Sequence, residues 1–185
     1  MEAIVACEKS ERITQALREK GVNAFSCDLL PSEIDGYPYH IQGDMRNLDY
    51  TGVDLLIAHP DCTYLASSGA RWWKGKEKQQ AEAIAFVKWI ADLPVPHIAI
   101  ENPIGKLSTV WRKPDQIIQP WMFGEGEVKA TCLWLKGLPL LIPTNIVEGR
   151  YPRVHLEAPS PERKANRSRT YQGIAQAMAT QWGIL

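Results

Sequence analysis

Four cysteines occur in the sequence, but no two of them are spaced as Cys-x-x-Cys, which argues against a zinc ribbon or a thioredoxin-like redox site. No apolar run approaches the roughly 18 residues that span a bilayer, and no basic region followed by a long apolar segment opens the chain. The 21 basic residues equal the 21 acidic residues, so a surface that holds duplex DNA by charge alone is not indicated. We therefore expect a soluble, cytoplasmic protein with reduced thiols and no membrane partner.

What the sequence does contain is an alternation of strand-like and helix-like patterns over 185 residues, 45% of them hydrophobic. The predicted strands are 3–6, 23–27, 54–58, 97–100, 116–121 and 130–135, and the predicted helices are 10–21, 78–93 and 174–182. Ser10 is suited to cap the first helix and Gly21 to end it. Residues 29–42 have the composition of a loop, with a helical turn predicted near 46–48. The alternation predicts a single-domain α/β fold with a Rossmann-like sheet.

Chemically useful side chains follow three of the predicted strands. Asp28 ends the second strand, the turn from His59 to Cys62 follows 54–58, and Glu101 follows 97–100. Because the carboxyl ends of parallel strands meet at one edge of a sheet, we expect these residues to share a crevice. An acid after the second strand is placed to accept hydrogen bonds from a ribose. A thiolate and a carboxylic acid on neighbouring strands can act on one heterocycle as nucleophile and proton donor.

Two of these strand ends resemble the cytosine carbon-5 DNA methyltransferases. The family's nucleophile motif, a strand followed by Pro-Pro-Cys, is similar to Ala58-His59-Pro60-Asp61-Cys62, and its Glu-Asn-Val motif is similar to Ile100-Glu101-Asn102-Pro103. Weaker similarities follow in the family's order at Gly43-Asp44, at 123–135 and at 171–177. The chain thus resembles a minimal, phage-type or prophage-type member without a full target-recognition domain.

The resemblance implies a class I methyltransferase sheet, S-adenosylmethionine as cofactor and DNA, single-stranded DNA included, as substrate. It implies that Cys62 adds to carbon 6 of the pyrimidine, that Glu101 protonates N3 and that Lys129 lies near the base. The implied cofactor contacts are Ala6, Cys7, Glu8, Asp28, Asp44 and Pro60. Residues 1–136 would form the catalytic core, 137–168 an irregular basic segment in place of the recognition domain, and 169–185 a closing helix that packs back on the core.

Two stretches combine positive charge with aromatic or loop character. Arg71-Trp72-Trp73 is followed by Lys74 and Lys76, and the segment 150–169 contains Arg150, Arg153, Arg163, Lys164, Arg167 and Arg169. Guanidinium groups contact phosphates and indole rings stack on bases, so this mixture favours a nucleic acid strand. The predicted nucleic-acid contacts are Arg71, Trp72, Trp73, Arg167 and Arg169.

Departures from the family pattern keep other functions open. The first loop, 6–10, has no glycine, Asp61 occupies the position of a proline, and 137–168 is too short for a typical recognition domain. The alternatives are a non-catalytic relative that binds nucleic acid or protein, and an enzyme that modifies carbon 5 of a free pyrimidine nucleotide. A partner chain that supplies specificity is a further expectation. Cys62 also fits a small buried thiol. His59 fits a loop-orienting residue as well as a ligand-binding one, and no metal site is expected.

Overall fold

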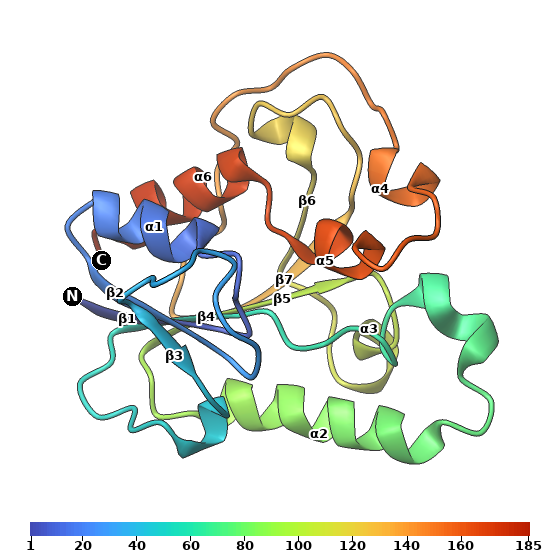
Figure 1. The fold of residues 1–185 in the computed structure, drawn as a ribbon, viewed down its shortest axis with the longest axis horizontal. Helices are drawn as coiled ribbons and strands as arrows, with labels where there is room; N and C mark the ends of the chain where they lie inside the picture. The colour runs from blue at the N-terminus through green and yellow to red at the C-terminus, as the bar shows by residue number, and fades with distance from the viewer.

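A seven-stranded sheet with the order β3-β2-β1-β4-β5-β7-β6 forms the centre of the molecule (Figure 1). The computed structural model describes residues 1–185 with all side chains except that of Lys164, which belongs to the predicted basic segment. The strands are β1 (Glu2–Ala6), β2 (Asn23–Asp28), β3 (His40–Gln42), β4 (Leu55–Ala58), β5 (His97–Pro103), β6 (Gln116–Ile118) and β7 (Thr131–Lys136). Strands β1 to β5 pair in parallel, and β7 is antiparallel to both β5 and β6. The predicted α/β fold is confirmed, and the mostly parallel mixed sheet is compatible with a Rossmann-like fold.

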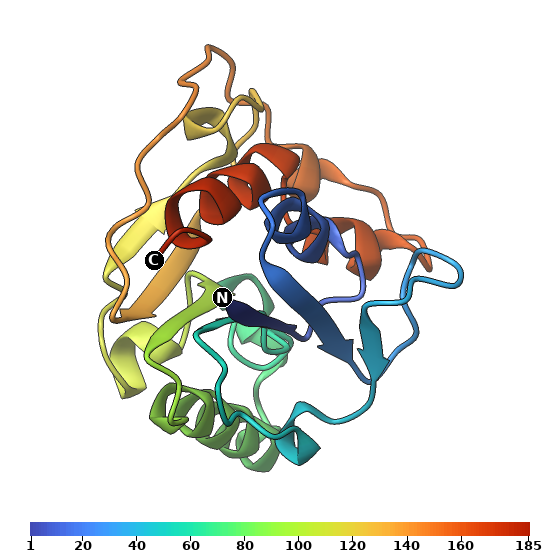
Figure 2. The same ribbon diagram turned by 90° about the vertical axis from the view of Figure 1, so that its left-hand side faces the viewer.

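Helices cover both faces of this sheet and create two apolar cores. The longer ones are α1 (Arg12–Glu19), α2 (Glu77–Asp92) and α6 (Gln172–Trp182). Helices α1 and α6 lie side by side on one face, where Ile13, Leu17 and Trp182 are completely buried, whereas α2 crosses the other face (Figures 1 and 2). There Ile90 packs with residues such as Leu56 of β4. Burial of these apolar side chains is the main source of stability for such layers.

The start of α1 differs from the prediction. Ser10 does not cap this helix; instead the carboxylate of Glu8 accepts hydrogen bonds from the amides of Ile13 (2.9 Å) and Thr14 (3.2 Å). A carboxylate has two acceptor oxygens and a negative charge, so it satisfies two free amides at the positive end of the helix. The predicted end is confirmed, because Gly21 follows the helix with a φ of 82°.

Two sheet-edge predictions were incomplete. Strand β3 lies within the predicted loop 29–42, and it pairs only with Ser26 to Asp28 of β2. At the other edge, β6 stops at Ile118 and a 3-10 turn, η3 (Pro120–Met122), replaces the predicted end of the strand. Pro120 lacks the amide hydrogen that a further ladder bond requires.

The segment 137–168 contains no strand in the described backbone, only the short helices α4 (Arg153–Leu156) and α5 (Arg163–Ser168). After it the chain crosses the loops at the carboxyl ends of β1 and β2. Arg169 Nε donates to Glu33 (2.6 Å), and Arg12 Nη1 donates to the carbonyl of Thr170 (2.7 Å). The remaining elements are the 3-10 turns η1 (Met45–Asn47) and η2 (Ser67–Trp72) and the short helix α3 (Leu107–Val110). Of the described helices, none has the length and apolar character to cross a membrane.

Candidate active site

The carboxyl ends of β1, β2, β4 and β5 bring the predicted residues to one edge of the sheet. The mutual electrostatic effects of these residues show how close they lie. Burial, followed by the charges of Asp28, Asp44 and Asp61 together with Cys27, raises the pKa of Cys7 to about 12. Asp61 also raises the pKa of Cys62. Asp61 therefore acts electrostatically both on Cys7, which was assigned to the cofactor site, and on Cys62, which was assigned to catalysis.

Cys62 occupies a tight turn immediately after β4. Its carbonyl accepts hydrogen bonds from the amides of Leu65 and Ala66, both at 2.9 Å, and the residue is half-buried. Burial, then the negative charges of Glu101 and Asp61, raise the pKa of its thiol, and Lys129 opposes them. Cys62 is consequently a thiol, not a thiolate, at neutral pH, and must lose a proton before it can act as a nucleophile.

Glu101 projects from β5 into a small polar cluster. Its Oε2 lies 3.1 Å from Nδ1 of His59, and Lys129 and the hydroxyl of Thr131 are close. Burial alone would raise the pKa of Glu101, but the His59 hydrogen bond, Lys129 and Thr131 together lower it. Glu101 is therefore a carboxylate in the free protein.

The loops after β4 and β5 are joined by several hydrogen bonds. The buried side-chain amide of Asn102 donates a hydrogen bond to the backbone carbonyl of Pro60 at 2.8 Å. Beyond it, the amide of Ser67 donates to Ile104 (3.0 Å) and that of Lys106 to Leu65 (2.8 Å). Between these bonds Gly105 faces the carbonyl of Leu65 so closely that an added Cβ would lie 1.9 Å from that oxygen. These contacts fix the position of Cys62 relative to Glu101.

The predicted cofactor residues divide into exposed and buried ones. Cys7, Asp28 and Asp44 are partly exposed at the sheet edge, whereas the side chains of Ala6, Glu8 and Pro60 are buried. The last three can therefore reach a ligand only through their backbone. Asp28 accepts a hydrogen bond from the amide of Leu30 (2.9 Å), and Asp44 binds the guanidinium of Arg46, which lowers the pKa of its carboxyl group.

The glycine-free first loop adopts conformations that glycine usually supplies. Cys7 and Glu11, which flank it, have φ values of 58° and 62°. Such backbone in non-glycine residues costs about 1–3 kcal/mol each and occurs preferentially at functional sites. The sequence did not predict these conformations, because nothing in its pattern indicates that a cysteine and a glutamate adopt left-handed backbone.

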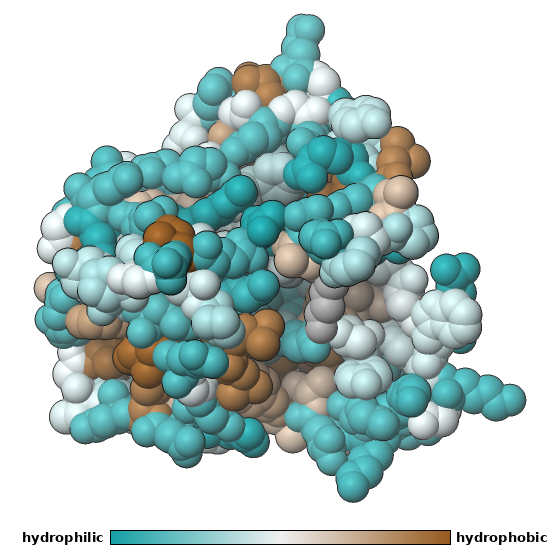
Figure 3. Space-filling model, viewed as in Figure 1, coloured by the Kyte–Doolittle hydropathy of each residue, from teal (hydrophilic) through white to brown (hydrophobic). Residues whose placement is uncertain are grey.

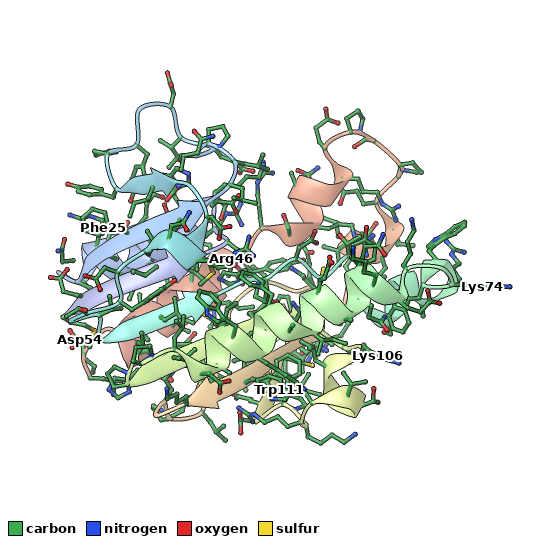
Figure 4. All side chains as sticks on the ribbon, turned by 90° about the horizontal axis from the view of Figure 1, so that it is seen from below. Phe25, Arg46, Asp54, Lys74, Lys106 and Trp111 are labelled. Carbon is green, nitrogen blue, oxygen red and sulfur yellow. The ribbon has the colours of Figure 1, made fainter. Side chains whose placement is uncertain are left out.

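The predicted nucleic-acid residues come from two elements. In and after η2, Trp72 is 71% exposed, and the guanidinium of Arg71 lies 5.1 Å from its ring centre. Trp73 is half-buried, with Lys106 Nζ at 5.9 Å from its ring. We refer to residues 67–76, which include η2, as the arm. Figure 4 shows Lys74 pointing outward from its tip, and Figure 3 shows a recess between the arm and the part of the molecule that carries α5. Arg167 on α5 is partly exposed, but Arg169 is occupied by Glu33.

Several residues of the site escaped the sequence-based assignment. The pairing of His59 with Glu101, the anchoring role of Asn102 and the contribution of Thr131 all depend on contacts between separate strands. His59 and Asn102 lie within the two motifs, and that position was the available signal. Among the described side chains, no three His, Cys, Asp or Glu residues gather as metal ligands would. Models of protein families and curated proteins were both compared with the chain, and neither comparison gave a match.

Replacement of Gly105 by alanine tests the contact between the two loops. Because the added Cβ would collide with the Leu65 carbonyl, we expect a loss of roughly 1–3 kcal/mol of unfolding free energy in urea denaturation. Gly43→Ala is the matched control, since nothing lies within 4 Å of the added atom there. Equal stability of the two variants would contradict the described approach of the loops.

The pH dependence of Cys62 alkylation tests the electrostatics of the site. We expect a midpoint above the ordinary 9.0 in the wild type, a lower midpoint in Glu101→Gln and a higher one in Lys129→Gln. Glu101 is ionised at these pH values, so its removal favours the thiolate, and loss of Lys129 has the opposite effect. Mass spectrometry after iodoacetamide treatment follows the reaction, and the exposed Lys78→Gln serves as control. A Glu101→Gln midpoint at or above that of the wild type would refute this arrangement.

Proposed function

We propose that this protein transfers a methyl group from S-adenosylmethionine to carbon 5 of cytosine through a covalent adduct at Cys62. The observation that carries the proposal is the pairing of a thiol and a carboxylate on adjacent strand ends, tied by the Asn102 hydrogen bond to Pro60. The negative charge of Glu101 raises the pKa of Cys62, which supports a joint action of the two groups on one ring. The antiparallel β7 between β5 and β6 is also what we expect of a class I methyltransferase sheet.

The cofactor edge suits a cationic ligand. The negative charges of Asp28, Asp44 and Asp61 each raise the pKa of Cys7, although Arg46 pairs with Asp44. S-adenosylmethionine carries a net positive charge, whereas a phosphate group would be repelled here. Asp28 and Asp44 would hold the cofactor, with the backbone of residues 6–8. The amides of α1 do not contribute, because Glu8 already occupies them.

The proposed reaction uses one proton from the site. The thiol proton of Cys62 passes to the Glu101 carboxylate and from there to N3 of the base, while Sγ adds to carbon 6. Bound S-adenosylmethionine supplies the electrophilic methyl carbon. Carbon 5, made nucleophilic by the adduct, would accept that methyl carbon with release of S-adenosylhomocysteine, and would then lose its own proton to solvent. Elimination of Sγ from carbon 6, together with return of the N3 proton to the Glu101 carboxylate, then restores the aromatic ring and the thiolate. Lys129 stabilises the negative charge that develops beside it.

The basic, aromatic arm favours a single-stranded substrate. Trp72 offers an exposed ring beside the guanidinium of Arg71, in the loop that continues from the Cys62 turn. A base of single-stranded DNA can stack on this ring directly, whereas a base in a duplex must first be flipped out at a free-energy cost of a few kcal/mol. The second candidate function is that of a nucleic-acid-binding relative without catalysis. It is favoured by the amides at the start of α1, which Glu8 already occupies and which therefore do not bind a cofactor.

Nucleoside mass spectrometry after incubation with S-adenosylmethionine tests the proposed reaction. Duplex DNA, single-stranded DNA and dCMP are compared, with Cys62→Ala as control. We expect 5-methylcytosine in the single strand with the wild type and none with the variant, because the nucleophile is missing. The cofactor should raise the melting temperature of both proteins. If no substrate is methylated and the cofactor causes no thermal shift, the proposal fails and the non-catalytic function remains.

Trp72→Ala tests the stacking surface. We expect binding of a single-stranded oligonucleotide to weaken by about 1–3 kcal/mol, measured by fluorescence anisotropy. Trp72→Phe should retain most of the affinity, because a phenyl ring also stacks on a base. Leu140→Ala, at another exposed apolar residue, is the control for nonspecific surface effects. Unchanged affinity in Trp72→Ala would exclude this ring from the binding surface.

A further inference from the structure

The imidazole of His59 lies at the centre of the site, although the proposed chemistry gives it no role. Its backbone amide donates to the carbonyl of Ala6 at 2.9 Å, so it joins the ends of β4 and β1. Its side chain is only 11% exposed, and Nδ1 lies 3.1 Å from Oε2 of Glu101. Its other ring nitrogen, Nε2, is buried without a hydrogen-bond partner among the described residues.

This environment selects one tautomer of the ring. With the proton on Nδ1, the ring donates to the Glu101 carboxylate, and only the Nε2 lone pair stays unpaired. With the proton on Nε2, a buried donor would lack an acceptor, and the Nδ1 lone pair would face a carboxylate oxygen. The Nδ1–H form is therefore the stable one, and its hydrogen bond fixes Oε2 of Glu101.

His59 borders a cavity that is too small for a base. Together with Glu101, Lys129 and Thr131, it lines a space of about 10 Å³ that Tyr171 and Ile174, from the region of α6, help to close. A space of this size is about that of one water molecule and excludes a pyrimidine ring. His59 therefore acts on a base through Glu101, its hydrogen-bond partner.

We propose that His59 is the positioning residue of the reaction, which holds Oε2 of Glu101 and thereby orients the carboxyl group toward N3 of the pyrimidine. This inference rests on the proposed function, since it assigns N3 protonation to Glu101. It accounts for the burial of His59, for its pairing across two strands and for the unpaired Nε2.

The neighbouring charges define what loss of His59 would do. Glu101 is faced by Lys129 from the loop before β7, by Thr131 and Cys132 on β7 and by Cys62 from the β4 turn. Tyr171, ahead of α6, borders the same cavity. The His59 hydrogen bond is the largest of the effects that lower the pKa of Glu101, and burial opposes it. Without His59, burial meets less opposition, so the pKa of Glu101 rises.

Two substitutions separate the hydrogen bond from the shape of the side chain. The amide nitrogen of His59→Asn can replace Nδ1 as a donor, whereas His59→Leu has similar reach and no donor. Carbon-13 NMR of the glutamate carboxyl groups, with Glu101→Gln for assignment, follows the Glu101 titration in each protein. We expect a midpoint below 4.5 in the wild type and in His59→Asn, and a higher midpoint in His59→Leu than in either of them.

Methylation assays on the same proteins add the catalytic readout. We expect kcat to fall roughly 10-fold to 100-fold in His59→Leu, to stay within about threefold in His59→Asn, and the KM for S-adenosylmethionine to stay constant. An unshifted Glu101 titration in His59→Leu, or equal kcat losses in both variants, would overturn the role of His59. A wild type that methylates no substrate sinks the proposed function instead, and the NMR titration still decides whether His59 controls Glu101.

Discussion

The hydrogen bond from Asn102 to the carbonyl of Pro60 is the contact on which the candidate site depends. Parallel pairing of β4 and β5 brings two strand ends together, but strands alone do not fix the loops that leave them. The buried side-chain amide of Asn102 and the close approach of Gly105 to Leu65 hold the two loops together beyond the last hydrogen bond between the strands. A side-chain amide thus continues, past the end of β4, the connection that the ladder makes between β4 and β5.

Around this scaffold, a chain with no net charge separates its charges locally. The carboxylates of Asp28, Asp44 and Asp61 collect at the cofactor edge, while Arg71, Lys74 and Lys76 lie on the arm beyond Cys62. One edge thus favours a cation and the neighbouring arm favours a polyanion. Lys129 brings positive charge close to both Cys62 and Glu101, and it opposes the rise in the thiol pKa.

The sequence was sufficient for the elements whose patterns are local. The apolar runs of β4 and β5 and the amphipathic pattern of α2 predicted those elements, and the motif residues Cys62 and Glu101 followed from their strand ends. Strand β3 has only three residues, too few for a periodic signal, and forms because β2 offers a free edge. The capping of α1 by Glu8 was missed because the loop reverses direction at Cys7. The His59–Glu101 contact joins residues 42 positions apart, which no local pattern encodes.

The crossing of residues 169–170 over the first loops has a consequence for how the protein forms. Arg169 contacts Glu33 across 136 positions, and Thr170 contacts Arg12 across 158. Contacts between such distant positions form slowly, because a long loop must close before they stabilise anything. On the ribosome, the loop from 29 to 36 therefore lacks its final restraint until most of the chain has been synthesised. The loop after β2, which is encoded early, is thus completed last.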